Sequence, residues 1–116
     1  MPVSNEEKEF SSYVVDMLQT IGPVYSKRMF GGHGIFLEGV MFALIADSEL
    51  YLKADNESEG DFIDRGLEPF TYNKKGKLMK MSYFQAPEEA LEDSEIMNEW
   101  GNKGYSAALR AATKKK

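Results

Sequence analysis

The chain has 116 residues, of which 42% are hydrophobic and 12% aromatic, and its formal net charge is −5. This length predicts one compact domain, and the hydrophobic content excludes a disordered chain. The absence of cysteine excludes disulfides, cysteine–zinc sites and thiol catalysis, and no stretch approaches the roughly 20 apolar residues of a membrane span. The acidic N-terminus lacks signal-peptide features, so we expect a cytoplasmic protein whose single domain covers residues 1–116, with a frayed tail at 113–116.

The N-terminal segment is predicted to form an amphipathic helix. Ser4 and Glu7 have the spacing of a capping box, in which each side chain satisfies the exposed backbone amide of the other residue. Gly22 and Pro23 would end the helix, because glycine accepts a left-handed backbone and proline cannot continue a helix. The apolar residues between these signals recur at helical spacing and form one stripe: Phe10, Tyr13, Val14, Met17, Leu18 and Ile21.

The next thirty residues predict four strands joined by short links, and such links require mostly antiparallel pairing. We expect a turn or bulge at Gly31-Gly32-His33-Gly34 and a tight reversal at Gly39. The longest apolar run, Val40–Ala46, predicts a strand that is buried on both faces at the centre of a sheet. The four strands are placed at residues 24–30, 35–38, 40–46 and 50–54.

The second half of the chain predicts a short helix and a hairpin. Asn56 and Glu59 offer a helix cap, and Phe62 anchors a helix that ends before Gly66. Strands at 69–72 and 78–84 flank the polar loop Asn73-Lys74-Lys75-Gly76, which is typical of a hairpin with a bulge.

Helices complete the chain after Pro87. Asp93 or Ser94 can cap the last of them, and Gly101 and Gly104 would let it lie close to the sheet or to another helix. The fold class that we predict is therefore α+β, with two layers: an antiparallel sheet of about five or six strands, an N-terminal helix and C-terminal helices.

Candidate chemistry is sparse, and we expect no enzyme, cofactor or metal site. The GGHG run could cradle an anion, but a strand rather than a helix follows it, so a structural role is favoured. His33 is the only histidine and is interpreted as a loop residue, because a metal site needs several converging ligands. The acidic residues 47–61 lack the spacing of a calcium-binding EF-hand loop and are interpreted as a solvated helix start.

The polar hairpin is the one basic region in the body of the chain. Lys74, Lys75, Lys77 and Lys80 could contact a nucleic-acid backbone, with nearby tyrosines as stacking faces. The overall acidic charge opposes autonomous nucleic-acid binding, and a merely soluble hairpin tip is the simpler interpretation.

An uncovered sheet face is a third possibility for function. A strand that is apolar on both sides, in a domain of two layers, leaves one sheet face without helices. The chain has seven methionines, which adapt to irregular cores and to partner surfaces alike. Dimerisation or the docking of a partner protein would cover such a face.

Three segments of the chain resemble the N-terminal domain family of the competence regulator TfoX, also called Sxy. They are RMFGGHGIFLEGVMFALIADSELYLKAD (28–55), RGLEPFTY (65–72) and MSYFQAPEEALED (81–93). The resemblance implies a curved antiparallel sheet with packed helices. It also implies a non-enzymatic role in switching on DNA-uptake genes, by assisting the cyclic-AMP receptor protein at promoters. Full-length members carry a second, helical domain, so the domain alone could bind a partner, compete with the full-length regulator or act otherwise.

From these observations we expect a protein-interaction module in transcriptional regulation that is related to competence control. Direct nucleic-acid binding through the lysine hairpin, and a small-ligand site at the glycine turn, are the alternatives. A homodimer is also compatible with the uncovered face. The candidate partner-binding residues are Lys27, Arg28, Phe30, Gly31, Gly32, His33, Gly34, Met79 and Met81.

Overall fold

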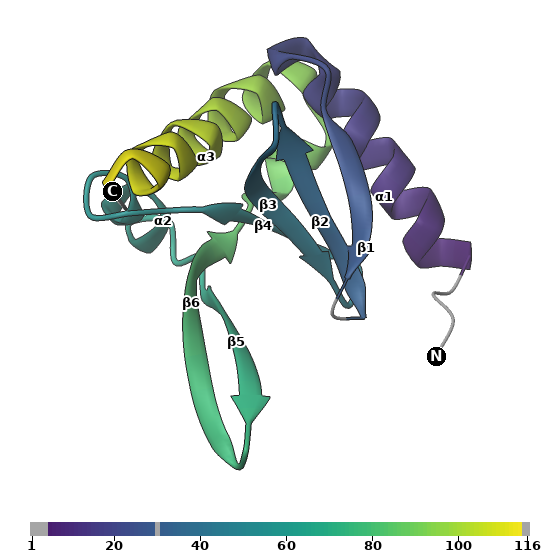
Figure 1. Cartoon of the computed structure of the whole chain (residues 1–116). Helices are drawn as coiled ribbons and strands as arrows, with labels where there is room; N and C mark the ends of the chain where they lie inside the picture. The colour runs from purple at the N-terminus through teal and green to yellow at the C-terminus, as the bar shows by residue number, and fades with distance from the viewer. Residues whose placement is uncertain (1–4, 30, 115–116) are drawn as a thin grey trace.

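The computed structural model describes residues 5–29 and 31–114; at positions 5, 74, 79, 80 and 114 it describes the backbone alone. The fold is α+β, as predicted, with one antiparallel sheet in the strand order β1-β2-β3-β4-β6-β5 (Figure 1). The strands are β1 Tyr25–Met29, β2 Gly32–Leu37, β3 Val40–Ala46, β4 Glu49–Lys53, β5 Pro69–Lys74 and β6 Lys77–Gln85. The helices are α1 Asn5–Leu18, α2 Glu59–Ile63 and α3 Ser94–Lys114, with short 3-10 turns at Gln19–Ile21 and Glu88–Leu91.

Helix α1 forms along the predicted apolar stripe. Val14 and Leu18 are fully buried, whereas Tyr13 is half exposed and its hydroxyl donates a hydrogen bond to the carbonyl oxygen of Leu91. The predicted capping box involves Ser4, which lies outside the described residues. At the other end of the chain, α3 runs to Lys114, into the stretch that we expected to fray.

Three two-residue turns connect the hairpins. Their central residues have positive φ angles, as type I′ turns require: 51° and 80° at Glu38-Gly39, 52° and 59° at Asp47-Ser48, and 53° and 80° at Lys75-Gly76. The predicted four-residue loop with a bulge is therefore wrong for the last hairpin, because Asn73 and Lys74 belong to β5. The irregularity of that hairpin lies instead at its base, between Pro69 and Thr71.

The glycine cluster differs from its prediction, because a strand replaces most of the expected turn. Gly31 alone has a positive φ of 78°, and Gly32 to Gly34 form the start of β2. A Cβ atom at position 32 would lie 2.1 Å from the carbonyl oxygen of Ile45, so glycine is needed for β2 and β3 to approach. His33 is consequently a buried strand residue and not the loop residue that we expected.

Helix α3 packs against both the sheet and α1, and its two glycines make this possible. A Cβ atom at Gly101 would lie 2.6 Å from Leu18 Cδ2, and one at Gly104 would lie 3.1 Å from the carbonyl oxygen of Phe42. The predicted close approach is therefore confirmed on both sides. Asp93 caps the helix, since its Oδ1 accepts hydrogen bonds from the amides of Glu95 (2.9 Å) and Ile96 (3.3 Å).

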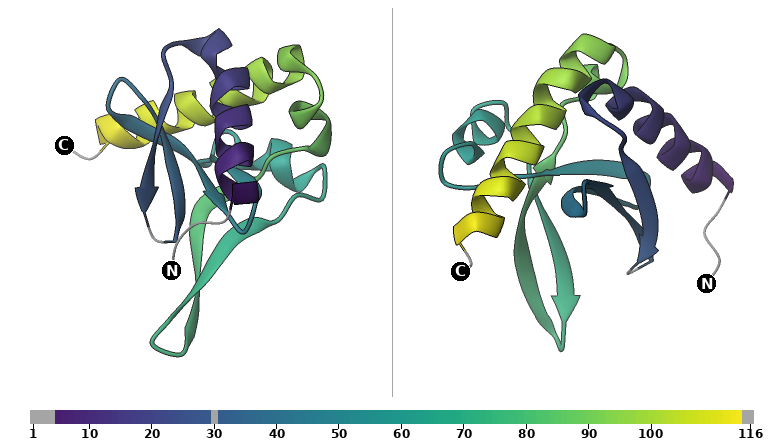
Figure 2. Two further views of the ribbon diagram at one scale, coloured as in Figure 1. Left: turned by 90° about the vertical axis from the view of Figure 1, so that its right-hand side faces the viewer. Right: turned by 45° about the horizontal axis from the view of Figure 1, so that its top comes forward.

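The helices gather on one side of a curved sheet and enclose the core there (Figure 2). Phe62 of α2 packs against the rings of Phe84 and Trp100, at centroid distances of 5.4 and 5.0 Å. The fully buried side chains of this core include Val14, Leu18, Ile35, Phe42, Ala43, Ile45, Leu52, Phe62 and Met97.

Strands β5 and β6 form a ribbon that projects from the body (Figure 1). β6 pairs with β4 over Tyr83, Phe84 and Gln85, and the carbonyl oxygen of Ser82 accepts one more hydrogen bond from Ala54. From Lys77 to Lys80, β6 is paired with β5 alone among the described residues.

Candidate functional site

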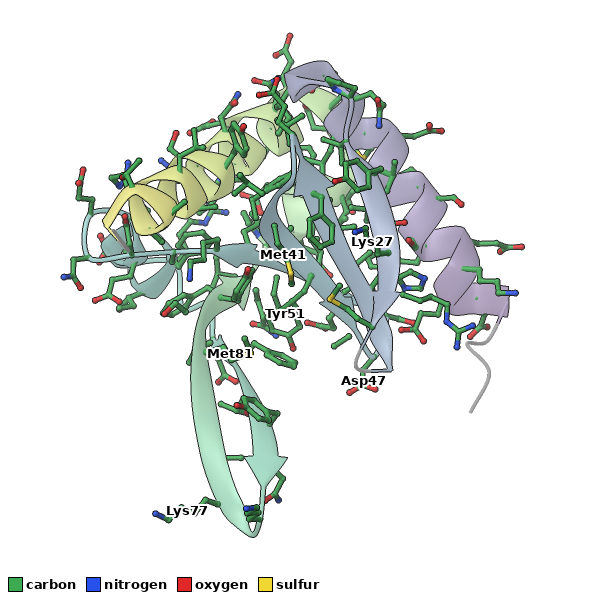
Figure 3. All side chains as sticks on the ribbon, in the orientation of Figure 1. Lys27, Met41, Asp47, Tyr51, Lys77 and Met81 are labelled. Atoms are coloured by element: carbon green, nitrogen blue, oxygen red, sulfur yellow. The ribbon has the colours of Figure 1, made fainter. Side chains whose placement is uncertain are left out.

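The face of the sheet opposite the helices carries a layer of aromatic, methionine and lysine side chains, which we call the open face. The pleat places these residues on one side, because side chains alternate along each strand. Met41 and Tyr51 of this layer face the side on which the β5–β6 ribbon lies (Figure 3). The open face consists of Tyr25, Lys27, Met29, Phe36, Met41, Leu44, Tyr51, Lys53, Phe70, Tyr72, Met81 and Tyr83.

A bulge in β3 explains why this strand is apolar on both sides. Ile35 pairs with Ala43 and Phe36 pairs with Met41, so Phe42 is an extra residue in β3. Phe42 and Ala43 both point into the helix-side core, and Met41 and Leu44 therefore point to the open face. Leu44 is fully buried there, which confirms the prediction of a strand buried on both faces.

One end of the open face is organised around Phe36. Its ring stacks on Tyr25 at a centroid distance of 5.5 Å, and Lys27 Nζ lies 5.2 Å from the centroid of the same ring. Gly34 leaves the space for this arrangement, because a Cβ atom there would lie 3.0 Å from Met29 Sδ and 3.1 Å from Phe36. Gly34 thus shapes the open face, whereas Gly32 serves the pairing of the strands.

The other end of the open face is a second aromatic group. Tyr51 and Phe70 meet edge to face at 5.0 Å, and Phe70 stacks on Tyr72 at 6.4 Å. Lys53 Nζ lies 5.2 Å from the ring centroid of Tyr83, and burial raises the pKa of Tyr83 to about 12. At neutral pH this end therefore presents neutral phenol rings beside a cation.

The exposure of the layer is intermediate, between that of a core and that of an ordinary surface. Tyr25, Tyr72 and Met81 are 40%, 38% and 37% exposed, and Leu44 and Tyr83 are buried. The half-buried members are Met29, Phe36, Met41, Tyr51, Lys53 and Phe70. Contiguous apolar surface of this kind is uncommon on a protein without a partner.

The structure separates the partner-binding residues predicted from the sequence. Lys27 and Met81 lie on the open face and are exposed, whereas Arg28 and His33 pair with each other on the opposite face. His33 is 6% exposed, and its Nδ1 has no hydrogen-bond partner among the described residues. Gly31, Gly32 and Gly34 provide backbone only, and Phe30 and the side chain of Met79 lie outside the described residues.

The predicted nucleic-acid residues all belong to the projecting ribbon. Lys75 and Lys77 are exposed beside its terminal turn. Lys74 pairs with Lys77, and Lys80 pairs with Thr71, so the four lysines occupy one end of the ribbon. At positions 74 and 80 the structure describes the pairing of the backbone but not the side chains.

Sequence reasoning missed the ion pair between Asp55 and Arg110. The guanidinium donates from Nε to Asp55 Oδ2 at 2.6 Å and from Nη2 to Oδ1 at 2.9 Å. Oδ1 also accepts from the amides of Glu57 and Ser58, so Asp55 rather than Asn56 caps the turn before α2. The hydrogen bonds from Arg110 lower the pKa of Asp55 to about 2.

That ion pair corrects the interpretation of the acidic stretch as merely solvated. Within 5–29 and 31–114, no group of three histidine, cysteine or acidic residues is placed to hold a metal ion. A shallow depression beside the glycine turn is lined by Arg28, Met29, Gly31 and Gly32, and the small-ligand alternative stays a prediction for it. None of the helices in these ranges is long and apolar enough to cross a membrane.

Comparison with known proteins finds a matching family profile and several similar proteins. The family profile described as TfoX N-terminal domain matches residues 16–108. DNA transformation protein TfoX1 of Aliivibrio fischeri is 29% identical over an alignment that covers 93% of this chain and 56% of that protein. Protein Sxy of Escherichia coli is 27% identical, with 63% and 35% covered, and DNA transformation protein TfoX of Haemophilus influenzae is 35% identical, with 59% and 32% covered. The chain thus matches about half or less of each relative's length.

Proposed function

The chain belongs to the TfoX N-terminal domain family, and on this premise we propose that it is a protein-interaction module in the transcriptional control of competence genes. Two of the relatives are named DNA transformation proteins, which supports a role related to DNA uptake. The module acts through a partner transcription factor, for which the cyclic-AMP receptor protein is our candidate. It acts by binding and not by catalysis.

The proposal rests on the aromatic and methionine side chains of the open face. Aromatic residues and methionine are enriched at protein interfaces, because they bury a large area and adapt their shape. Covering the exposed parts of Tyr25, Tyr72 and Met81 would remove apolar surface from water, at roughly 25 cal/mol for each Å². The surrounding side chains are already ordered by ring contacts, so binding would immobilise little that is free.

The chemistry of the open face also describes the partner surface. Lys27 and Lys53 lie over aromatic rings within the layer, so the apolar surface includes two positive charges, although the carboxylates of Glu49, Asp47 and Glu68 act on nearby Tyr51. A complementary partner offers an apolar patch with carboxylates at its rim. A second copy of this chain would bring an identical pair of lysines to the interface, and this like charge disfavours it as the occupant.

The proposal is tested by measuring the affinity of the purified chain for purified cyclic-AMP receptor protein, with cyclic AMP and without DNA. Tyr25→Glu places a charge on the open face, whereas Leu109→Glu does the same at an equally exposed position of α3, since both residues are 40% exposed. We expect at least tenfold weaker binding for Tyr25→Glu and less than a twofold change for the control. Equal affinity of the two variants would contradict the proposal that the open face binds the partner.

A different outcome would identify the homodimer instead. Sedimentation of the chain alone, followed by the same Tyr25→Glu variant, distinguishes a second copy from a transcription factor. A dimer that dissociates on this substitution, together with no binding to the receptor protein, would contradict the proposed partner.

A further inference from the structure

The β5–β6 ribbon has a composition unlike that of the rest of the chain. Residues 69–87 contain four of the 14 lysine and arginine residues and none of the 19 acidic residues. All four lysines fall between positions 74 and 80, around the terminal turn at Lys75-Gly76. Four positive charges with no acidic residue among them are therefore gathered toward the tip of the element that projects from the body (Figure 1).

The ribbon projects from the acidic body of the protein, so the negative charge of the body does not prevent nucleic acid from binding at the ribbon tip. Beyond Ser82, the described part of β6 pairs with β5 alone, so Lys77 lies about 17 Å along the strand from Ser82, at roughly 3.4 Å per residue. The Debye length is about 8 Å at physiological ionic strength. The tip is thus more than one screening length from the acidic body, and a polyanion would meet the field of the lysines first.

Leu78 gives a second, independent indication of a ligand at the tip. Its side chain is 73% exposed, more than any other large hydrophobic residue described, and the exposed residues Lys75 and Lys77 lie next to it around the turn. An apolar side chain among cations does not stabilise a ribbon that has no core beneath it. Proteins that read the major groove of DNA use apolar side chains against the methyl group of thymine.

We propose that the β5–β6 ribbon binds duplex DNA, with its lysines on the phosphates and Leu78 against the bases. The major groove of B-form DNA is about 12 Å wide and admits a two-stranded ribbon. The corresponding groove of an RNA duplex is too narrow for side chains to read, so DNA is the better match. The open face reaches along the ribbon only as far as Tyr72 and Met81, so a partner bound there leaves the terminal turn at Lys75-Gly76 available.

The test is fluorescence anisotropy with a labelled DNA duplex of about two helical turns (~20 bp), at salt concentrations between about 50 and 200 mM. For four phosphate contacts, the slope of log affinity against log salt is expected near −3.6, from about −0.9 per contact. Lys75→Gln/Lys77→Gln should weaken binding at least tenfold and reduce the slope by about 1.8. Leu78→Ala should weaken binding several-fold and leave the slope unchanged.

A matched control separates the ribbon from net charge. Lys8→Gln/Arg28→Gln removes the same two charges from exposed positions on α1 and on β1, at the opposite edge of the sheet. We expect this variant to bind within twofold of the wild type. Equal weakening by both double variants would overturn the proposal, as would tighter binding to single-stranded DNA or no binding near 50 mM salt.

The inference fails separately from the proposed function. Tyr25→Glu alters the open face only, so it should weaken partner binding at least tenfold and retain DNA binding. The lysine variant should behave in the opposite way when the partner is offered without DNA. Because the substituted ribbon residues contact no core residue among those described, circular dichroism should show an unchanged melting temperature for each ribbon variant.

Discussion

Asp55 and Arg110 are 55 positions apart in the chain and form a two-pronged ion pair, with N–O distances of 2.6 and 2.9 Å. Asp55 follows β4 and caps the turn before α2, and Arg110 is in the last part of α3. The pair therefore fastens the C-terminal helix to the loop between the sheet and α2. Planar geometry of this kind is the strongest form that a partly exposed ion pair takes.

The Asp55→Asn substitution should make stability less dependent on acid pH. The folded-state pKa of Asp55, about 2, lies below its ordinary value of 3.8, so the carboxylate stabilises the fold above pH 4 and this contribution is lost as the pH falls toward 2. Since the side chain is 19% exposed, we expect Asp55→Asn to cost about 1 kcal/mol at neutral pH. Urea unfolding followed by circular dichroism at several pH values measures this cost.

The control for that experiment is Asp61→Asn, which breaks the more exposed pair with Lys103. It should change the free energy of unfolding by less than about 0.5 kcal/mol at neutral pH. A cost of Asp55→Asn that stays constant from pH 7 to the acid range would contradict the assigned pKa.

Gly32→Ala should be among the most damaging single-methyl additions to the chain. The new Cβ would lie 2.1 Å from a backbone oxygen of β3, which cannot move without breaking the sheet, so we expect a loss of about 3 kcal/mol or more. Gly60→Ala in α2 is the matched control, because no atom lies within 4 Å of its Cβ position. It should raise stability by up to about 1 kcal/mol, through helix propensity. Thermal unfolding of both variants measures these changes in stability. A Gly32→Ala variant as stable as the wild type would refute the role of Gly32 in the close approach of β2 and β3.

The elements that the sequence predicted well are those with local signals. The apolar stripe of α1, the buried run of β3 and the cap at Asp93 all depend on residues a few positions apart. Turns such as Glu38-Gly39 can also be recognised from the sequence, because few residues accept positive φ. These patterns were sufficient for the α+β class and for antiparallel pairing.

What the sequence did not reveal depends on tertiary neighbours. Glycines usually mark turns, but the reason for Gly32 is the backbone of a strand thirteen residues later at Ile45. His33 is buried because β2 places it on the helix side of the sheet, with Ile35 and Leu37, and Asp55 is paired because Arg110 reaches it from α3. The open face was foreseen as an uncovered surface, but its members could be assigned only once the bulge at Phe42 was known.

Phe84→Ala and Leu78→Ala should differ sharply in stability, although both residues lie in β6. Phe84 is 8% exposed and stacks on Phe62, so its truncation should cost about 3 kcal/mol. Leu78 is 73% exposed on the ribbon, and its truncation should cost less than about 0.5 kcal/mol. Chemical denaturation measures both costs. A large loss for Leu78→Ala would mean that this side chain has a folding role.

Gly34→Ala should keep the fold and impair the open face. The added Cβ would meet Met29 Sδ at 3.0 Å and Phe36 at 3.1 Å, and the methionine end can move aside. We expect a stability change within about 1 kcal/mol, since a small overlap with a flexible side chain is tolerated. Partner affinity, measured by titration, should fall several-fold because Met29 and Phe36 are displaced. Unchanged affinity would place the docking surface elsewhere.

Nuclear magnetic resonance of the methionine methyl groups tests most directly whether the open face is the surface that binds the partner. Met29, Met41 and Met81 lie on the open face, whereas Met17 of α1 and Met97 of α3 belong to the helix side. On addition of unlabelled cyclic-AMP receptor protein, we expect the three open-face signals to shift or broaden and the two helix-side signals to remain unchanged. Perturbation of Met17 and Met97 with the other three unchanged, or of none of the five, would contradict it.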